Sequence, residues 1–204
     1  GQYHTCGIRT DGTATCWGAD GSGEAPATLA GTWTQITAGG GHTCGIHTDG
    51  TATCWGDDAR GQAPETLTGT WTQITAGDEH TCGIRGDGTA TCWGQNTDGQ
   101  APSTLDGTWA DLAAGDYHAC GTRPDGTATC WGWDNAGQAP GDLAGTWTDI
   151  AAGQLHTCGI RTDGTATCWG DDGAGQAPGS LPGTWADLTA GEEHTCGVRT
   201  NGTA

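Results

Sequence analysis

A histidine and two cysteines recur together along this chain, and they are the residue types most able to do chemistry. The first copy is the stretch HTCGIRTDGTATCWG, residues 4–18, in which His4, Cys6 and Cys16 surround an Asp-Gly pair. His4 and Cys6 would share one face of a strand, so with Cys16 they could offer three ligands to zinc. They could also form a nucleophilic Cys/His pair or a disulfide-stapled hairpin.

The copy number argues against catalysis. The histidines are spaced by 38 residues throughout, at His4, His42, His80, His118, His156 and His194. An enzyme needs one asymmetric arrangement of groups in a pocket, so we predict a scaffold that is not an enzyme and has no catalytic residue. The spacing also lacks the Cys-x-x-Cys pair typical of zinc sites, so we predict no metal site. We expect the histidines to be buried and hydrogen-bonded to nearby backbone.

The 38-residue spacing also organises the chain. It defines a single repeat domain, 1–204, with repeats 1–38, 39–76, 77–114, 115–152 and 153–190 and a partial sixth repeat, 191–204. In each repeat two strand-like segments flank a turn, as in a hairpin, and a third, TWTQITA in the first repeat, follows a loop. No segment has helical periodicity. We therefore predict an all-β protein of antiparallel blades, arranged as a propeller or as an open superhelical array.

The hairpin register decides whether the cysteines meet. A two-residue Asp-Gly turn would place Cys6 opposite Trp17, whereas a three-residue loop would place Cys6 opposite Cys16. In the fourth repeat Pro124 replaces Thr10. Proline suits the second position of a type I turn and lacks the N–H that the shorter loop would need there. The sequence therefore predicts the three-residue loop.

This register predicts one disulfide in each full repeat. The pairs are Cys6–Cys16, Cys44–Cys54, Cys82–Cys92, Cys120–Cys130 and Cys158–Cys168. Each would contribute about 2–3 kcal/mol through loop-closure entropy. Cys196, in the partial repeat, is predicted to be unpaired or to bond another molecule. Because disulfides persist in oxidising compartments, we predict an extracellular or cell-surface location.

The net charge of the chain limits the classes of partner that it can bind. Six basic residues, all arginine, stand against 24 acidic residues, and the net charge is −18. Such a chain repels phosphate backbones and anionic lipids, and it has no apolar run long enough to span a membrane. We predict that it does not bind nucleic acid and does not insert into a membrane.

The positions that vary between repeats lie just before the first strand and just after the second strand of each hairpin. Both sets fall at the hairpin end opposite the turn, and we call them the rim. The predicted binding residues of the rim are Tyr3, Asp20, Asp57, Asp58, Asn96, Asp116, Tyr117, Trp133, Asp134, Asp171 and Asp172. Tyr117 and Trp133 should stand together in the fourth repeat. Aromatic anchors of this kind dominate many protein interfaces, which favours a protein partner.

The sequence also contains features typical of other ligands and modifications. The acidic rim residues that recur in phase could bind calcium, although their spacing matches neither the EF-hand nor the nonapeptide repeat, and no cofactor is predicted. Asn201 begins a glycosylation sequon.

The tryptophans recur at fixed phase, which is typical of packing between blades, and sugar binding is their alternative role.

The repeat has a recognisable pattern. Residues 38–77, AGGGHTCGIHTDGTATCWGDDARGQAPETLTGTWTQITAG, resemble the RCC1-type repeat (regulator of chromosome condensation), in the short bacterial version of β-lactamase inhibitory protein II. The matching elements are AGxxH, the DG turn, WGxxxxGQ and WxxIxAG. The resemblance covers the whole chain and implies a β-propeller whose loops bind other proteins. Known members usually have seven blades and no cysteine pair, so this chain departs from the family in both respects.

We therefore predict a secreted or surface repeat scaffold, non-enzymatic and acting in protein binding or assembly. The alternatives are a subunit of an extracellular filament or sheath that self-associates through its repeat ends, an inhibitor of an extracellular enzyme, and a lectin.

Overall fold

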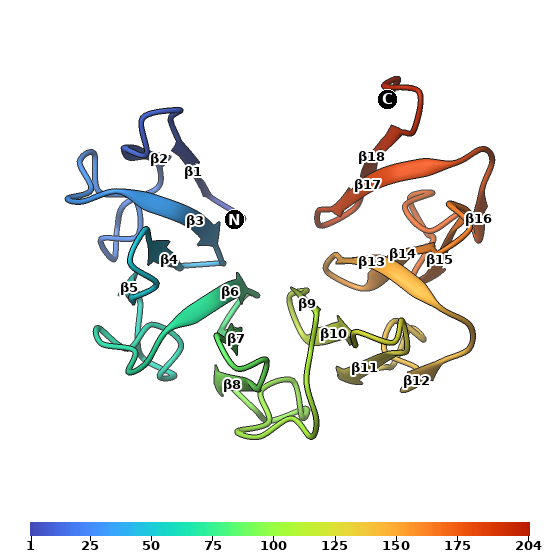
Figure 1. Cartoon of the computed structure of the whole chain (residues 1–204), viewed down its shortest axis with the longest axis horizontal. Helices are drawn as coiled ribbons and strands as arrows, with labels where there is room; N and C mark the ends of the chain where they lie inside the picture. Colours follow the sequence, from blue (N-terminus) through green and yellow to red (C-terminus); the bar gives the residue numbers. More distant parts are fainter. The chain divides into compact units, whose positions relative to one another are not determined.

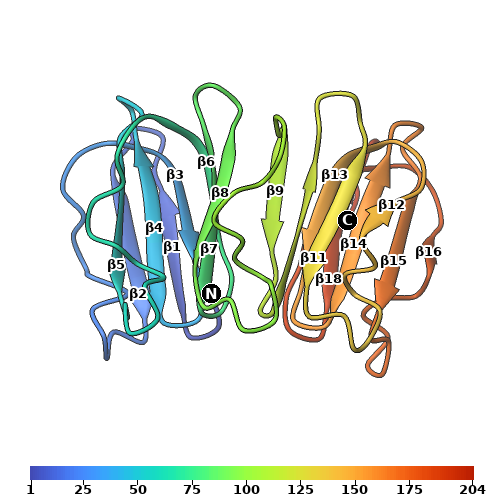
Figure 2. The same ribbon diagram turned by 90° about the horizontal axis from the view of Figure 1, so that it is seen from below.

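Every regular element of the chain is a β-strand. A computed structural model describes all residues from 1 to 204, and it contains no helix able to cross a membrane. The chain forms two compact units, Gly1–Thr97 with Ala101–Gly107 and Asp98–Gln100 with Thr108–Ala204. Figure 1 labels the strands, and Figure 2 shows the same strands lengthwise.

The first unit contains three antiparallel sheets. Their strand orders are β1-β2, β3-β4-β5 and β6-β7-β8. The strands are β1 (His4–Ile8), β2 (Ala14–Gly18), β3 (Trp33–Ala38), β4 (His42–His47), β5 (Ala52–Gly56), β6 (Trp71–Ala76), β7 (His80–Arg85) and β8 (Ala90–Gly94).

The second unit also contains three antiparallel sheets. Their orders are β12-β11-β10-β9, β13-β14-β15-β16 and β17-β18. The strands are β9 (Asp111–Ala114), β10 (His118–Thr122), β11 (Ala128–Gly132), β12 (Asp142–Leu143), β13 (Trp147–Ala152), β14 (His156–Arg161), β15 (Ala166–Gly170), β16 (Ser180–Leu181), β17 (Trp185–Ala190) and β18 (Thr195–Arg199). We call the six sheets blades 1 to 6, in chain order.

The blades are out of phase with the sequence repeats. Strand β3 closes the first repeat, yet it pairs with β4, which opens the second. The same offset joins β6 to β7 and β13 to β14. Each complete blade therefore takes its first strand from one repeat and its hairpin from the next.

The hairpin turns have the predicted three-residue loop. The Arg9 amide donates to Thr13 O at 2.8 Å, and Gly12 has a φ of +83°, which favours glycine. The Asp11 carboxylate accepts hydrogen bonds from the amide and hydroxyl of Thr13, and these bonds lower the pKa of Asp11. The loop sets the register that places Cys6 opposite Cys16.

One disulfide is present in each full repeat, as predicted. The five pairs are Cys6–Cys16, Cys44–Cys54, Cys82–Cys92, Cys120–Cys130 and Cys158–Cys168. Their Cα atoms lie 3.9–4.1 Å apart, somewhat closer than the roughly 4.5 Å typical of a non-hydrogen-bonded pair in antiparallel strands. The bonded sulfurs are not thiolates, so they are not zinc ligands in this structure. Cys196 is free and exposed.

The tryptophans pack both between blades and within them. Trp71 of blade 3 joins a buried cluster with Cys44, Ile46 and Cys54 of blade 2, in agreement with the predicted packing between blades. Trp71 also contacts Trp93 of its own blade edge to face, with ring centroids 5.6 Å apart. This contact was not predicted. The ring crosses Gly83, where an added Cβ would lie 2.8 Å from it.

Candidate functional site

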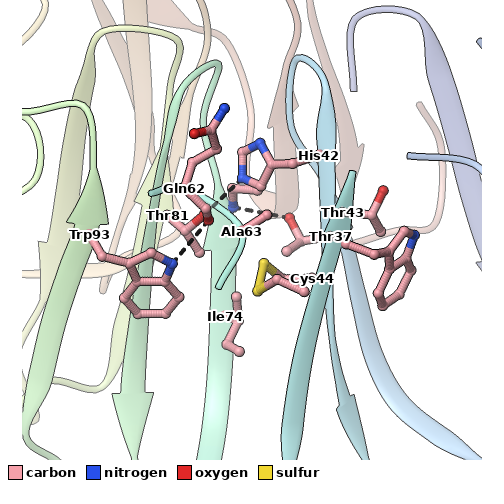
Figure 3. Close-up of a disulfide and its surroundings, with 12 residues drawn as sticks. Thr37, His42, Thr43, Cys44, Gln62, Ala63, Ile74, Thr81 and Trp93 are labelled. Carbon is pink, nitrogen blue, oxygen red and sulfur yellow. Dashed lines mark hydrogen bonds between the residues drawn. A yellow bond between two sulfur atoms is a disulfide. The ribbon is translucent and has the colours of Figure 1, made fainter. Parts of the chain in front are cut away.

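The recurring histidines connect consecutive blades. His42 Nε2 lies 2.8 Å from Thr81 Oγ1, and the Thr81 hydroxyl donates to Gln62 O at 2.9 Å. The Trp93 indole N–H donates to the same carbonyl at 3.0 Å. Figure 3 shows these four residues beside the Cys44 disulfide. The expectation of a histidine bonded to backbone did not include this partner, a threonine hydroxyl on the next blade.

This His–Thr bridge recurs in both units. The pairs are His4–Thr43 and His42–Thr81 in the first unit and His118–Thr157 and His156–Thr195 in the second. Because the Thr81 proton goes to Gln62 O, His42 Nε2 must carry its own proton and donate. Burial, aided by the charge of His4, lowers the pKa of His42 to about 4, which keeps the ring neutral at pH 7. The four bridging histidines therefore join consecutive blades.

The two halves of the rim meet at the base of each hairpin. Backbone amides just after the second strand donate to carbonyls just before the first, as in Trp133 N to Tyr117 O at 3.0 Å and Asp171 N to Leu155 O at 2.8 Å. The antiparallel pairing of the hairpin therefore brings together positions that are 16 residues apart in sequence.

Most of the predicted acidic rim residues stabilise their own loops. A side-chain oxygen accepts a backbone amide five residues later in every repeat; the pairs are Asp20–Ala25, Asp58–Ala63, Asn96–Ala101, Asp134–Ala139 and Asp172–Ala177. The carboxylates of Asp57 and Asp171 accept hydrogen bonds from the side-chain Nε2 groups of Gln62 and Gln176 respectively. No group of three or more His, Cys, Asp or Glu side chains is arranged to hold a metal ion.

The remaining predicted sites are at the surface. Tyr3 is 68% exposed. Asn201 is exposed in a turn, where its side-chain oxygen accepts from the amide and hydroxyl of Thr203. Asp116 accepts a hydrogen bond from Gln154 Nε2 at 3.1 Å, which ties its carboxylate to the next blade.

Tyr117 and Trp133 come together as an aromatic pair. Their ring centroids are 5.2 Å apart and the rings are inclined by 71°. Both side chains are half-buried. Hairpins at the same positions elsewhere carry Gly41 with Asp57, or Leu155 with Asp171. Tyr3 holds the equivalent position in the first repeat, but its partner position holds Ala19. Only the fourth repeat therefore pairs two aromatic residues at the rim.

Arg60 lies in a variable segment of the rim but was not among the predicted binding residues. Its guanidinium Nε lies 3.6 Å from Glu79 Oε2, so that the loop after β5 contacts the rim of blade 3. The sequence does set Arg60 apart, because the other five arginines all lie at the turn ends of the hairpins.

The repeated blades and their bridges define the class of this chain, an all-β repeat protein. The profile described as "Regulator of chromosome condensation (RCC1) repeat" matches residues 1–24, 33–62, 71–100, 109–138 and 147–176. The matches cover more than half of the sequence, and the chain belongs to the RCC1 repeat family. No curated protein matches the chain.

Solved structures share the fold. The ectodomain of the Physcomitrella patens receptor kinase CR4 aligns with a TM-score of 0.80 and 27% identity, over 98% of this chain and 57% of that one. Yeast RCC1 (Prp20) bound to Kap60 aligns with a TM-score of 0.82 and 17% identity, over 98% of this chain and 67% of that one. Prp20p from Saccharomyces cerevisiae, described with its binding to Gsp1p and histones, aligns with a TM-score of 0.77 and 16% identity, over 96% and 66%. The chain thus spans 57–67% of these structures.

Proposed function

We propose that this chain is a secreted or surface-exposed, non-enzymatic scaffold that binds a partner protein through the rim of its second unit. The observation that carries the proposal is the Tyr117–Trp133 corner. Two half-buried aromatic rings are placed there by the rigid end of a disulfide-stapled hairpin. Rigid aromatic side chains are the usual anchors of protein interfaces, and a scaffold that varies one rim suits recognition.

Two further observations support this proposal. Five disulfides in one chain favour an oxidising compartment, and a receptor-kinase ectodomain shares the fold. Yeast RCC1 is described in complex with Kap60, and Prp20p with Gsp1p and histones. Binding of a protein partner is therefore a role that this fold already serves.

The proposal is tested by affinity capture with matched variants. The rim variant carries Tyr117→Leu and Trp133→Gln, which are the residues of the equivalent positions 155 and 95. The turn variant carries Thr162→Ala at the opposite end of a hairpin. We expect an extracellular protein that binds the wild-type chain and the turn variant but is lost from the rim variant, as quantified by mass spectrometry. Partners retained equally by both variants would refute a binding role for this rim.

A further inference from the structure

Blades 3 and 4 differ in charge at equivalent places on the rim. At the rim of blade 3, the Arg60 guanidinium from the loop after β5 forms an ion pair with Glu79 at 3.6 Å. The repeat carries positions 60 and 79 onto 98 and 117, which hold Asp98 and Tyr117. Arg60 and Glu79 at the rim of blade 3 are thus replaced by Asp98 and Tyr117 at the rim of blade 4.

The loop that carries Asp98 is held against blade 4. Asp98–Gln100 belongs to the second unit, where Gln100 O accepts from the Trp131 indole N–H at 3.1 Å. The Asp98 amide donates to Gln100 Oε1 at 2.9 Å, which fixes the base of the loop and leaves Asp98 exposed. Asp98 is therefore held at the loop position that Arg60 occupies one repeat earlier.

Further carboxylates flank the aromatic corner, and no arginine does. Asp116 directly precedes Tyr117, and Asp134 directly follows Trp133. Five of the six arginines lie at the turn ends of the hairpins: Arg9, Arg85, Arg123, Arg161 and Arg199. The sixth is Arg60. The aromatic corner is thus strongly acidic in a chain whose net charge is already −18.

The turn ends show how this chain pairs cations with aromatic rings. The Arg123 guanidinium carbon lies 4.2 Å from the centroid of the Trp109 ring, and the Arg161 carbon lies 4.2 Å from that of Trp147. A cation over an aromatic face is attracted by the ring quadrupole, and more strongly where water is partly excluded. Half-buried Trp133 offers the same kind of surface, without an arginine from its own hairpin.

We propose that the Tyr117–Trp133 corner, with Asp98, Asp116 and Asp134, binds a lysine or arginine side chain in a basic segment of the partner protein. The inference rests on the proposed function and gives its rim a ligand chemistry. The aromatic rings would cover the alkyl stem and the charged head, while the surrounding carboxylates compensate the charge.

The test measures binding of an acetylated, amidated tetra-arginine peptide by isothermal titration calorimetry at low salt. Tetra-citrulline, which has nearly the same shape but no charge, serves as the control peptide. We expect Trp133→Gln to raise the Kd for tetra-arginine about fivefold or more through loss of the ring. Asp98→Arg should raise the Kd by more than about tenfold, because it supplies an internal cation as Arg60 does and leaves both rings intact.

A charge-matched control separates this site from general attraction. Glu65→Arg makes the same change in charge at an exposed position of the first unit, and we expect it to affect the Kd far less than Asp98→Arg. Equal effects of the two substitutions, an unchanged Kd for Trp133→Gln, or equal binding of tetra-citrulline would overturn the inference. If tetra-arginine fails to bind but the rim variant still loses its captured protein, the inference fails and the proposed function stands. If the rim variant keeps its partners, both fail.

Discussion

At the scale of single residues, the side chain at the position of Asp149 accepts a hydrogen bond from the next blade. In blade 2 the equivalent Gln35 accepts the backbone amide of Ile74, on the next blade, at 2.8 Å. The Asp149 carboxyl group likewise accepts a hydrogen bond from the backbone amide of Leu188. Burial and the nearby charges of Asp111 and Asp187 nevertheless raise the pKa of Asp149 to about 6. A neutral acceptor suits this position better than a carboxylate does.

We therefore expect Asp149→Asn to stabilise the protein at pH 8, by about 1–2 kcal/mol once solvent screening at this half-buried site is allowed for. The folded-state pKa lies above the ordinary value of 3.8, so the native state holds this proton more tightly than the unfolded chain does. The protonated carboxyl group therefore has no cost below about pH 4, and stability is lost as the pH rises from there through 6.

The measurement is urea unfolding of both proteins from pH 4 to pH 8. The gain in unfolding free energy should be largest at pH 8 and disappear near pH 4. Asp187→Asn, at the same position of the next repeat but exposed, should give a smaller gain. A pH-independent difference between wild type and Asp149→Asn would contradict the electrostatic explanation.

At the scale of elements, the His–Thr bridge joins strands of neighbouring blades. Thr81 is fully buried, accepts from His42 and donates to Gln62 O. Thr81→Val keeps the shape of the side chain but leaves the His42 N–H without its acceptor. We expect a loss of about 2–3 kcal/mol in unfolding free energy, because an unsatisfied buried donor bears its full desolvation cost.

Thr5 provides the matched control. It occupies the same strand position in the first hairpin but is exposed. We expect Thr5→Val to change the unfolding free energy by less than about 0.5 kcal/mol. Similar small losses for both substitutions, in denaturant titrations at pH 7, would show that the bridge contributes little to stability.

At the scale of the whole molecule, the repeated histidines make stability depend on acid. Burial lowers the pKa of His4, His42, His80 and His156. Neutral imidazoles are thus required by the fold, whereas the unfolded chain takes up protons from about pH 6.5 downward. Their contribution to stability is fully present above pH 6.5 and is lost as the pH falls toward 4, the folded-state pKa of His42.

The expected loss from His42 alone is about 3 kcal/mol between pH 6.5 and 4, and the other histidines add to it. The smaller opposite contribution of Asp149 should not reverse the trend. Urea unfolding across this range checks the expectation. A stability that is constant from pH 7 to pH 4 would contradict this account.

The sequence by itself determined the local features of this protein. The 38-residue period, the hairpins and the pairing of Cys6 with Cys16 follow from turn chemistry, since Pro124 excludes the shorter loop. The meeting of Tyr117 and Trp133 follows too, because antiparallel pairing brings the two ends of a hairpin together. These features depend on residues fewer than 20 positions apart and on the two-residue period of a strand.

Only the tertiary structure decided how the repeats join. It assigned β3 to the blade of the following hairpin, found the Thr81 hydroxyl for His42, and turned Asp58 inward to its own loop. It also placed Arg60 against Glu79, the contact that reveals the charge reversal at Asp98. Contacts between blades depend on packing across about one full repeat, where strand periodicity and turn chemistry impose no register. The sequence therefore predicts the repeated hairpin, whereas long-range packing determines which strands and side chains of neighbouring repeats meet.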